Sequence, residues 1–228
     1  MNPVHVRWAL RLACVVALTG IGAGAGGIVV TLVLHLLEHI AFGYTAGTLL
    51  DGVLQAPPWQ RVVALGTAGV LGGVGWWALR RFAAPLVTIP KAVAGERMPA
   101  LTTLSNVGLQ IGIVGLGASI GREAAPRELG AFVADRLSAA FGLTARERRI
   151  IVACGAGAGL AAVYNVPFGG ALFTVEILLA EFSFATALPA FATAAIAALV
   201  GRIIVPGTPL SITVSPTTIP VRVWPSAV

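Results

Sequence analysis

Charged residues are scarce in this sequence. Asp, Glu, Lys and Arg account for 11% of its 228 residues, whereas an average soluble domain carries about 25%. Hydrophobic residues account for 57%, and the mean hydropathy is +0.91. Stretches without any of the four charged residue types cover 12–34, 62–79, 100–121, 150–175 and 182–201. Because a spanning helix needs about 20 apolar residues, the sequence excludes an ordinary soluble domain and predicts an all-α, multi-pass membrane protein.

Cysteine is also rare, with only Cys14 and Cys154 in the chain. They lie in separate apolar stretches and form no C-x-x-C pair, so we expect two buried apolar cysteines and no disulfide. Histidine occurs only in the N-terminal part of the chain, at His5, His35 and His39. The G-x-S-x-G match at 117–121 therefore has no histidine after its serine, as this hydrolase motif requires. The sequence predicts no catalytic residues, no cofactor and no enzyme activity.

One metalloprotease pattern stays open as an alternative. The segment 35–39, HLLEH, matches H-x-x-E-H and sets His35 and His39 one helical turn apart, beside Glu38. A membrane zinc protease would use these three residues. No third ligand stands out downstream, and the segment directly follows a long apolar stretch. A polar cap where the first helix leaves the membrane is therefore the favoured interpretation.

The basic residues lie mainly at the ends of the apolar stretches and give the chain a net charge of +6. They have no interleaved aromatic residues and include Arg7, Arg11, Arg80, Arg81, Lys91, Arg97, Arg146, Arg148 and Arg149. This distribution is typical of residues that set membrane topology and not of a nucleic-acid surface. We expect the lipid bilayer as a partner, no nucleic acid, an inner-membrane location and a cytoplasmic N-terminus, with segment 44–60 outside.

Glycine is frequent, with 28 residues, and recurs at helical spacing. Pairs four residues apart are Gly20 and Gly24, Gly22 and Gly26, Gly69 and Gly73, Gly117 and Gly121, and Gly155 and Gly159. Small residues at this spacing let helix backbones approach closely in a membrane. The G-x-G-x-x-G match at 22–27 lies inside an apolar stretch, without the strand that a dinucleotide site requires. The glycines therefore predict a tightly packed helical bundle.

The apolar pattern also predicts the order of the helices. They are expected over 8–40, 59–82, 101–119, 123–141, 146–164, 167–180 and 184–204. The segment 85–99, PLVTIPKAVAGERMP, is too short and too rich in proline to span, so we expect a half helix beginning near Pro90 with its N-terminus inside the protein. A transmembrane domain would comprise residues 1–205, followed by a Pro-rich tail at 206–228.

Arg122 and Glu123 stand side by side between two apolar stretches. A charge at mid-membrane costs about 2.5 to 3.5 kcal/mol on insertion scales, so the pair is expected to face protein or water. Pro126 falls in the first turn of the following helix, which puts Glu123 at a helix N-terminus. Free backbone N–H groups attract anions there. The Glu123 carboxylate is then a tethered anion that an inorganic anion can displace, and the half helix at Pro90 can aim a second N-terminus at the same point.

Three segments of the sequence resemble the CLC family of voltage-gated chloride channels and chloride–proton antiporters. The stretch GREAAPRELG, at 121–130, is similar to the Gly-Arg-Glu-Gly-Pro motif, which maps the gating glutamate of the family onto Glu123. The stretch 155–176, GAGAGLAAVYNVPFGGALFTVE, resembles the adjoining Gly-Ala-rich segment, and LVTIPKAVAG, at 86–95, resembles the Gly-Ser-Gly-Ile-Pro loop with its half helix. The resemblance implies broken half helices, one half of a CLC-type inverted repeat, and chloride or a related small anion as substrate.

The sequence departs from the family pattern at several positions. Val87 stands where the family has the serine that contacts chloride, and Leu86 and Thr88 replace the flanking glycines. Glu176 matches the conserved glutamate that closes the second segment, but Ile177 occupies the position at which antiporters carry a proton-relaying glutamate. The resemblance therefore implies a passive pathway without proton coupling.

By this resemblance, the anion site lies at two helix N-termini and comprises Gly121, Arg122, Glu123, Ala124, Ala125, Val87, Ile89 and Pro90. Glu123 would gate the site and Arg122 would orient its loop. Family chains contain two inverted halves, whereas this sequence corresponds to the first half; in a complete form we expect a homodimer. We therefore expect either a fragment or a chain completed by a second chain or partner, and a nonconducting fragment or assembly subunit stays open as an alternative.

Overall fold

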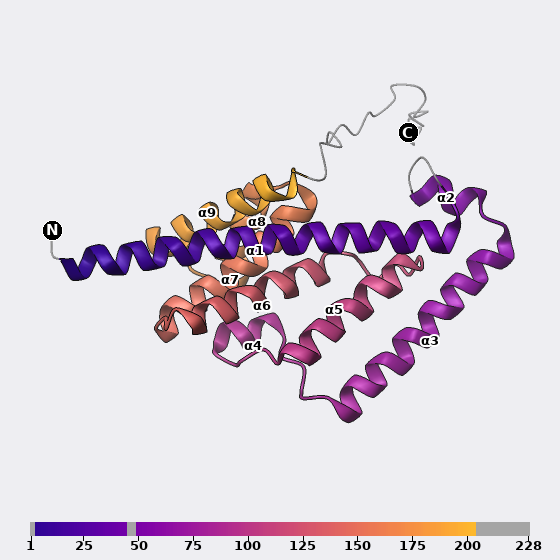
Figure 1. Cartoon of the computed structure of the whole chain (residues 1–228), viewed down its shortest axis with the longest axis horizontal. Coiled ribbons are helices and arrows are strands. Elements are labelled where there is room, and N and C mark those ends of the chain that lie inside the picture. The colour runs from indigo at the N-terminus through magenta and orange to yellow at the C-terminus, as the bar shows by residue number, and fades with distance from the viewer. Residues whose placement is uncertain (1–2, 45–48, 204–228) are drawn as a thin grey trace, which may run out of the picture.

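The computed structural model describes residues 3–44 and 49–203. Over these residues the chain folds into helices without any strand, which confirms the predicted all-α architecture (Figure 1). The predicted tail at 206–228 lies outside the described residues, so the expected boundary between it and the transmembrane domain stays a prediction.

One long helix, α1 (Pro3–Phe42), runs along the whole length of the molecule (Figure 1). Its 40 residues correspond to about 60 Å at 1.5 Å per residue, roughly twice the thickness of a bilayer core. The helices α5 (Ala100–Gly115), α6 (Ala124–Ala140), α7 (Ala145–Tyr164) and α9 (Phe184–Gly201) all contact α1. The first helix is therefore the support on which the later helices pack.

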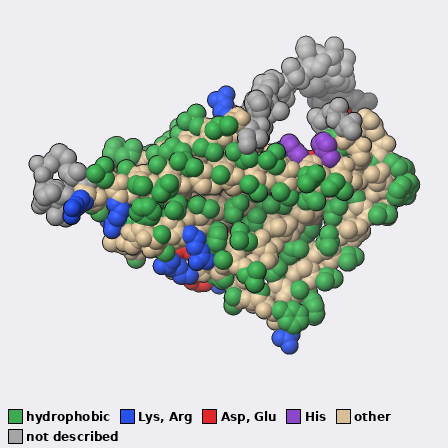
Figure 2. All heavy atoms as spheres, in the orientation of Figure 1, with side chains coloured by type: hydrophobic (Ala, Val, Ile, Leu, Met, Phe, Trp, Pro, Cys, Tyr) green, Lys and Arg blue, Asp and Glu red, His purple; other side chains and the backbone are tan. Residues whose placement is uncertain are grey.

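Three of the described helices are long and apolar enough to cross a membrane. They are Arg7–Phe42 within α1, α3 (Pro58–Phe82) and α9. The shorter α5 is also apolar but ends at Gly115, four residues before the predicted end at 119, because the chain turns at Leu116 and at Gly117, whose φ is +92°. Figure 2 shows hydrophobic side chains spread over this face of the molecule. These features agree with a membrane protein.

The predicted half helix is present as α4 (Ile89–Ala94), with Pro90 in its first turn and Thr88 as its N-cap. It ends at Gly95, whose φ of +121° favours glycine. A second short helix, α2 (Leu49–Gln55), lies in the connection between α1 and α3. Sequence reasoning had assigned this connection to an external loop and missed the helix.

The predicted helix at 167–180 is divided into two parts. It begins as α8 (Pro167–Leu172) and continues as the π-helix η1 (Phe173–Leu178). Before it, α7 starts with a capping box, in which the Thr144 hydroxyl accepts from the Glu147 N–H and the Glu147 carboxylate accepts from Thr144. This capping box explains why α7 begins at Ala145, one residue before the predicted start at 146.

Close helix packing through glycine is confirmed for three of the five predicted pairs. Gly20 and Gly24 face Ile196 and Val200 of α9, and the Gly22 and Gly26 pair faces side chains of α6. A Cβ added at Gly155 or Gly159 would meet the carbonyl oxygens of Gly130 and Pro126, so the backbones of α6 and α7 touch. This close approach holds the first half of α6 against α7.

The prediction was wrong for the other two pairs. Gly69 and Gly73 have open space around them, and α3 instead approaches α5 through Gly72 and Gly75. Gly117 and Gly121 lie in the loop between α5 and α6, where their φ values of +92° and +83° require glycine. Spacing alone did not distinguish an interface glycine from a lipid-facing or loop glycine.

Candidate functional site

The loop that joins α5 to α6 carries the predicted site. Gly121 sits at φ +83°, and a Cβ at this residue would lie 2.5 Å from a carboxylate oxygen of Glu123. The positive φ favours glycine at this position. The Glu123 side chain therefore folds back over the loop that precedes α6.

Glu123 is the N-cap residue of α6 and adopts φ −80° and ψ −22°. Its side chain makes no capping hydrogen bond, although it lies at the helix N-terminus and is only half-buried. In the first turn, Ala124 and Ala125 carry N–H groups without intrahelical acceptors, and Pro126 carries none. An anion at this helix end would meet two free N–H groups and the positive end of the helix dipole.

Two arginines flank Glu123 and are held by other groups. The Arg127 Nε donates to the Glu123 backbone carbonyl at 3.0 Å, and its guanidinium lies 5.4 Å from the Phe173 ring centroid. The Arg122 guanidinium lies 5.7 Å from the ring centroid of Tyr164. Among the ion pairs of the described residues, none includes Glu123. The carboxylate is therefore not neutralised by a neighbouring cation.

The side of the loop that faces α1 and α5 is closely packed. Gly121, Arg122 and Ala125 line a cavity of about 10 Å³ together with Gln110 and apolar residues of α1 and α5. This volume holds at most one water molecule and is too small for a chloride ion to pass. An anion that reaches the α6 N-terminus must approach from another side.

The second predicted helix N-terminus, at α4, packs against the middle of α6. Val87 is buried in one core cluster with Ala131 of α6 and Ile151 of α7, and Ile89 packs partly buried against this cluster. Ala131 lies eight residues beyond Glu123, or about 12 Å along the helix axis. The role of Val87, Ile89 and Pro90 in an anion site stays a prediction.

Pro90 lies at a different cavity, of about 710 Å³, beside α4 and the start of α7. Four arginines line this cavity, namely Arg97, Arg146, Arg148 and Arg149. Sequence reasoning treated Arg148 as a topology marker at a span end, but it is 8% exposed and forms an ion pair with Asp135. That assignment was wrong for Arg148, because its guanidinium is turned into the protein.

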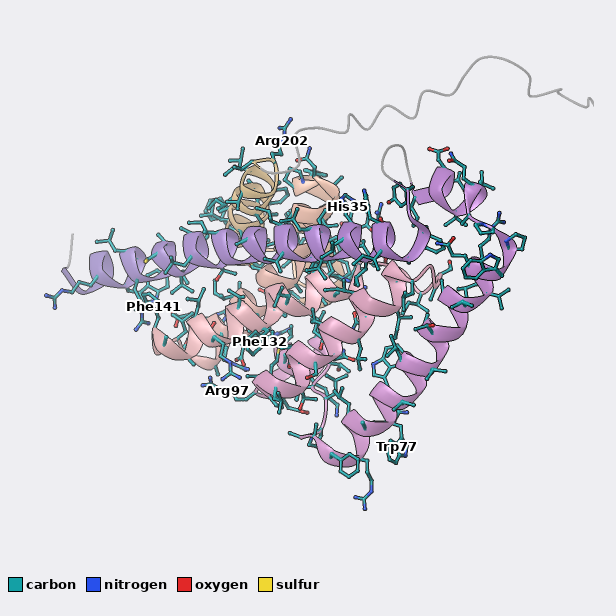
Figure 3. All side chains as sticks on the ribbon, turned by 45° about the vertical axis from the view of Figure 1, so that its right-hand side comes forward. His35, Trp77, Arg97, Phe132, Phe141 and Arg202 are labelled. Carbon is teal, nitrogen blue, oxygen red and sulfur yellow. The ribbon has the colours of Figure 1, made fainter. Side chains whose placement is uncertain are left out.

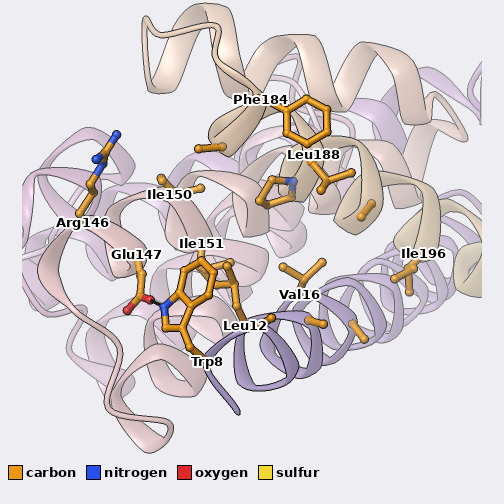
Figure 4. Close-up of a pocket in the computed structure, with 16 residues that line it drawn as sticks. Trp8, Leu12, Val16, Arg146, Glu147, Ile150, Ile151, Phe184, Leu188 and Ile196 are labelled. Atoms are coloured by element: carbon orange, nitrogen blue, oxygen red, sulfur yellow. Dashed lines mark hydrogen bonds between the residues drawn. The ribbon is translucent and has the colours of Figure 1, made fainter. Parts of the chain in front are cut away.

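Another cavity, of about 820 Å³, lies among α1, α7 and α9 and is almost wholly apolar (Figure 4). Its polar rim includes Arg146 and the pair formed by the Trp8 indole and the Glu147 carboxylate. None of the predicted site residues lines it. Its chemistry does not suit an inorganic anion, which needs N–H donors or cations.

Glu176 and Ile177 both lie in η1 with exposed side chains, Ile177 at 67%. The predicted relay position is therefore on the surface of the described part of the chain. π-helical turns are rare and often mark functional positions. The sequence predicted one regular helix over 167–180 and gave no indication of the π-helix η1.

The H-x-x-E-H segment does not form a metal site in the described residues. His35 lies on the outer side of α1 (Figure 3), and its backbone carbonyl contacts His39 Nδ1 at 2.9 Å. Glu38 is 4% exposed and accepts a hydrogen bond from the Tyr44 hydroxyl. No group of three His, Cys, Asp or Glu side chains in these residues is arranged to hold a metal ion. The zinc protease alternative is therefore not favoured.

Comparisons with known proteins agree with this fold. Residues 75–228 match the sequence family described as voltage gated chloride channel. The curated proteins named "Voltage-gated ClC-type chloride channel ClcB" from Escherichia coli and from Shigella boydii are each 29% identical over 174 residues, which cover 74% of this chain. The chain spans 41% of the length of these relatives.

A solved structure has the same fold. The crystal structure of a slow cyanobacterial Cl−/H+ antiporter matches with a TM-score of 0.61 and 21% sequence identity, and the match covers 85% of this chain and 46% of the other. At this identity the likeness concerns the fold alone. It extends over most of the described helices.

Proposed function

Because the chain belongs to the voltage-gated chloride channel family, we propose that it forms one half of a pathway for chloride or a related small anion, gated by the Glu123 carboxylate. Passage of an anion along this pathway requires no enzyme activity, no cofactor and no nucleic acid.

The observation that carries this proposal is the position of the Glu123 carboxylate. It lies over Gly121 at the start of α6, without a capping hydrogen bond and without an ion pair among the described residues. A carboxylate stabilised by neither contact is easily displaced. Chloride can bind the N–H groups of Ala124 and Ala125, to which the carboxylate makes no capping hydrogen bond, and the nearby carboxylate opposes it because both are anions.

The gate opens when the carboxylate leaves the helix N-terminus. A proton that neutralises Glu123 weakens its attraction to the helix dipole, and an entering anion repels the ionised form. Arg122 and Arg127 keep the loop in place during this movement, because each is held against an aromatic ring. Val87, Ile89 and Pro90 would line a second helix N-terminus that approaches the anion from the other side.

The pathway is passive rather than proton-coupled. Ile177 carries no titratable group at the position where a relay would need one. The complete protein lies in the inner membrane with its N-terminus in the cytoplasm, because the basic residues gather at the span ends on that side. It works as a homodimer in which further polypeptide supplies the second half of each anion site.

The test is anion flux in liposomes through the complete assembly that contains this chain. Glu123→Gln removes the competing charge and should raise chloride efflux and flatten its pH dependence. Glu96→Gln is the matched control, because Glu96 is an exposed glutamate outside the site and its exchange should leave both quantities unchanged. Equal flux and equal pH response in Glu123→Gln and the parent protein would remove Glu123 as the gate.

A further inference from the structure

A second glutamate of α6, Glu128, lies in a buried polar cluster that the anion gate does not use. It is 8% exposed and faces α5, where Asn106 and Gln110 both donate to its Oε2 atom, at 2.8 and 2.9 Å. From α3, the Trp76 indole donates to the Asn106 Oδ1 atom at 2.9 Å. We call Trp76, Asn106, Gln110 and Glu128 the Glu128 cluster. Its bonds form a chain of donors that ends on a single carboxylate oxygen.

Two buried acceptor atoms of this cluster have no hydrogen-bond partner. The Oε1 atoms of Glu128 and of Gln110 are both buried, and neither has a hydrogen-bond partner in the structure. An ionised carboxylate presents about four acceptor sites, and the Asn106 and Gln110 amides donate to the same oxygen of Glu128. A buried charge with half of its oxygens unmatched carries a large desolvation penalty.

No neighbouring charge offsets that penalty. Residues 100–115 of α5 contain no titratable side chain, and α1 contributes the apolar Val30 and Leu34 to the core at this level. The adjacent Arg127 is held by the Glu123 carbonyl and the Phe173 ring. None of the ion pairs formed by the described residues includes Glu128.

Several other ionisable groups on the packed helices have partners of their own or are exposed. On α1, Glu38 accepts from Tyr44 and His35 is exposed. On α6 and α7, Asp135 pairs with Arg148, and Tyr164 lies under Arg122. Glu128 is therefore the buried carboxyl group of α6 that has amide donors but no cation.

We propose that Glu128 binds a proton and is a neutral carboxylic acid in the resting protein, and that it forms a second protonation site of α6 behind Glu123. The bound proton removes the buried charge. It also turns the Glu128 Oε1 atom into a hydroxyl that can donate a hydrogen bond. The cluster then gains one donor, where the ionised form has two buried acceptors without a partner, the Oε1 atoms of Glu128 and Gln110.

The consequence for anion passage rests on the proposed function. Glu128 lies five residues beyond Glu123, or about 7.5 Å along the helix axis. A negative charge there opposes an anion held at the α6 N-terminus, because charges at this distance interact strongly in a low-dielectric interior. Loss of the Glu128 proton at alkaline pH should therefore reduce anion flux, and Glu128→Gln should abolish this alkaline decline.

The proton itself can be observed without any flux measurement. We would record infrared spectra of the purified chain in lipid and compare the carbonyl band of protonated carboxylic acids, at neutral pH, among the parent, Glu128→Gln and Glu123→Gln. The parent should show the band, and Glu128→Gln should lose it. A Glu128→Gln spectrum identical to that of the parent would overturn the proposal, including the case in which bound water satisfies an ionised Glu128.

A stability measurement separates the site from a folding defect. Glutamine has the shape of the protonated acid, so Glu128→Gln should melt at or above the temperature of the parent. The folded parent holds a proton that the unfolded chain releases, so its melting temperature should fall with rising pH by more than that of the variant. Equal pH slopes would contradict the proposal. The infrared and melting results do not depend on whether Glu123 is the anion gate. Failure of the Glu128 proposal can therefore be distinguished from failure of the proposed function.

Discussion

Arg148 of α7 and Asp135 of α6 form a buried ion pair, with the Arg148 Nη2 and Nε atoms 2.7 and 2.9 Å from the Asp135 Oδ1 atom. The same guanidinium donates to the backbone carbonyl of Glu96 at 2.7 Å, and Asp135 accepts from the Met98 N–H through its other oxygen. The pair thereby fastens the turn after α4 to the ends of two core helices. It sets the position of α4 with respect to α6.

Asp135→Asn should destabilise the protein strongly. The variant retains an oxygen for the Met98 N–H but leaves the buried Arg148 charge without a counter-ion, a change that costs about 3 to 5 kcal/mol in buried pairs. Thermal unfolding in detergent measures the effect. The control is Glu181→Gln, which breaks the exposed pair between Glu181 and Arg146 at 4.0 Å and should cost less than about 1 kcal/mol. Equal losses in the two variants would contradict a structural role for the buried pair.

Gly155→Ala and Gly69→Ala should change stability in opposite directions. A methyl group at Gly155 meets the Ala134 Cβ at 2.6 Å and the Gly130 carbonyl oxygen, so α6 and α7 must separate. Overpacking of this kind costs about 1 to 3 kcal/mol. Gly69 has open space around it, and alanine is preferred over glycine within helices by about 1 kcal/mol. Melting temperatures should show this contrast, and a loss at Gly69 as large as that at Gly155 would refute the assigned interface.

The complete assembly that contains this chain should not couple anion movement to protons. Ile177 cannot carry a proton, so a chloride gradient across liposomes should not drive protons uphill. A pH-sensitive dye inside the liposomes reports this movement directly, and a proton ionophore added afterwards serves as the positive control for the dye. Uphill acidification or alkalinisation under a chloride gradient would contradict the passive assignment.

A polypeptide restricted to residues 1–228 should not release chloride from liposomes. The described helices supply one side of the proposed anion site, and the chain spans 41% of the length of its curated relatives. A chloride electrode outside the liposomes measures efflux, with empty liposomes as the comparison. Robust efflux from the 228-residue chain alone, above that of empty liposomes, would show that no second half is needed.

Several features of the fold were predictable because they depend on local chemistry. The long apolar stretches predicted α1, α3 and α9. Pro90 predicted the start of α4 to within one residue, because α4 begins at Ile89. The Thr144 and Glu147 spacing, typical of a capping box, accompanies the correctly predicted start of α7. Glu123 at a helix N-terminus followed from the same kind of reasoning, since proline in a first turn marks the beginning of a helix.

The features that were missed depend on contacts between distant parts of the chain. The partnership of Arg148 with Asp135 joins two helices, and charge at a span end looks alike in sequence whether it faces solvent or protein. Glu128 meets Asn106 and Gln110 across the α5–α6 interface. Polar residues within otherwise apolar helices were the available signal, because such residues turn inward in a membrane.

The direct backbone contacts at Gly130, Gly155 and Gly159 also bear on how fast the proposed gate can act. Helices that touch through main-chain atoms cannot slide or rotate past each other without first separating, so their amide hydrogens should exchange more slowly than those of α3, which has a largely exposed surface. The movement left to Glu123 is rotation of a half-buried side chain, an event of picoseconds to nanoseconds in exposed residues. The kinetics of the gate would then be set by the arrival of protons and anions and not by the rearrangement of helices.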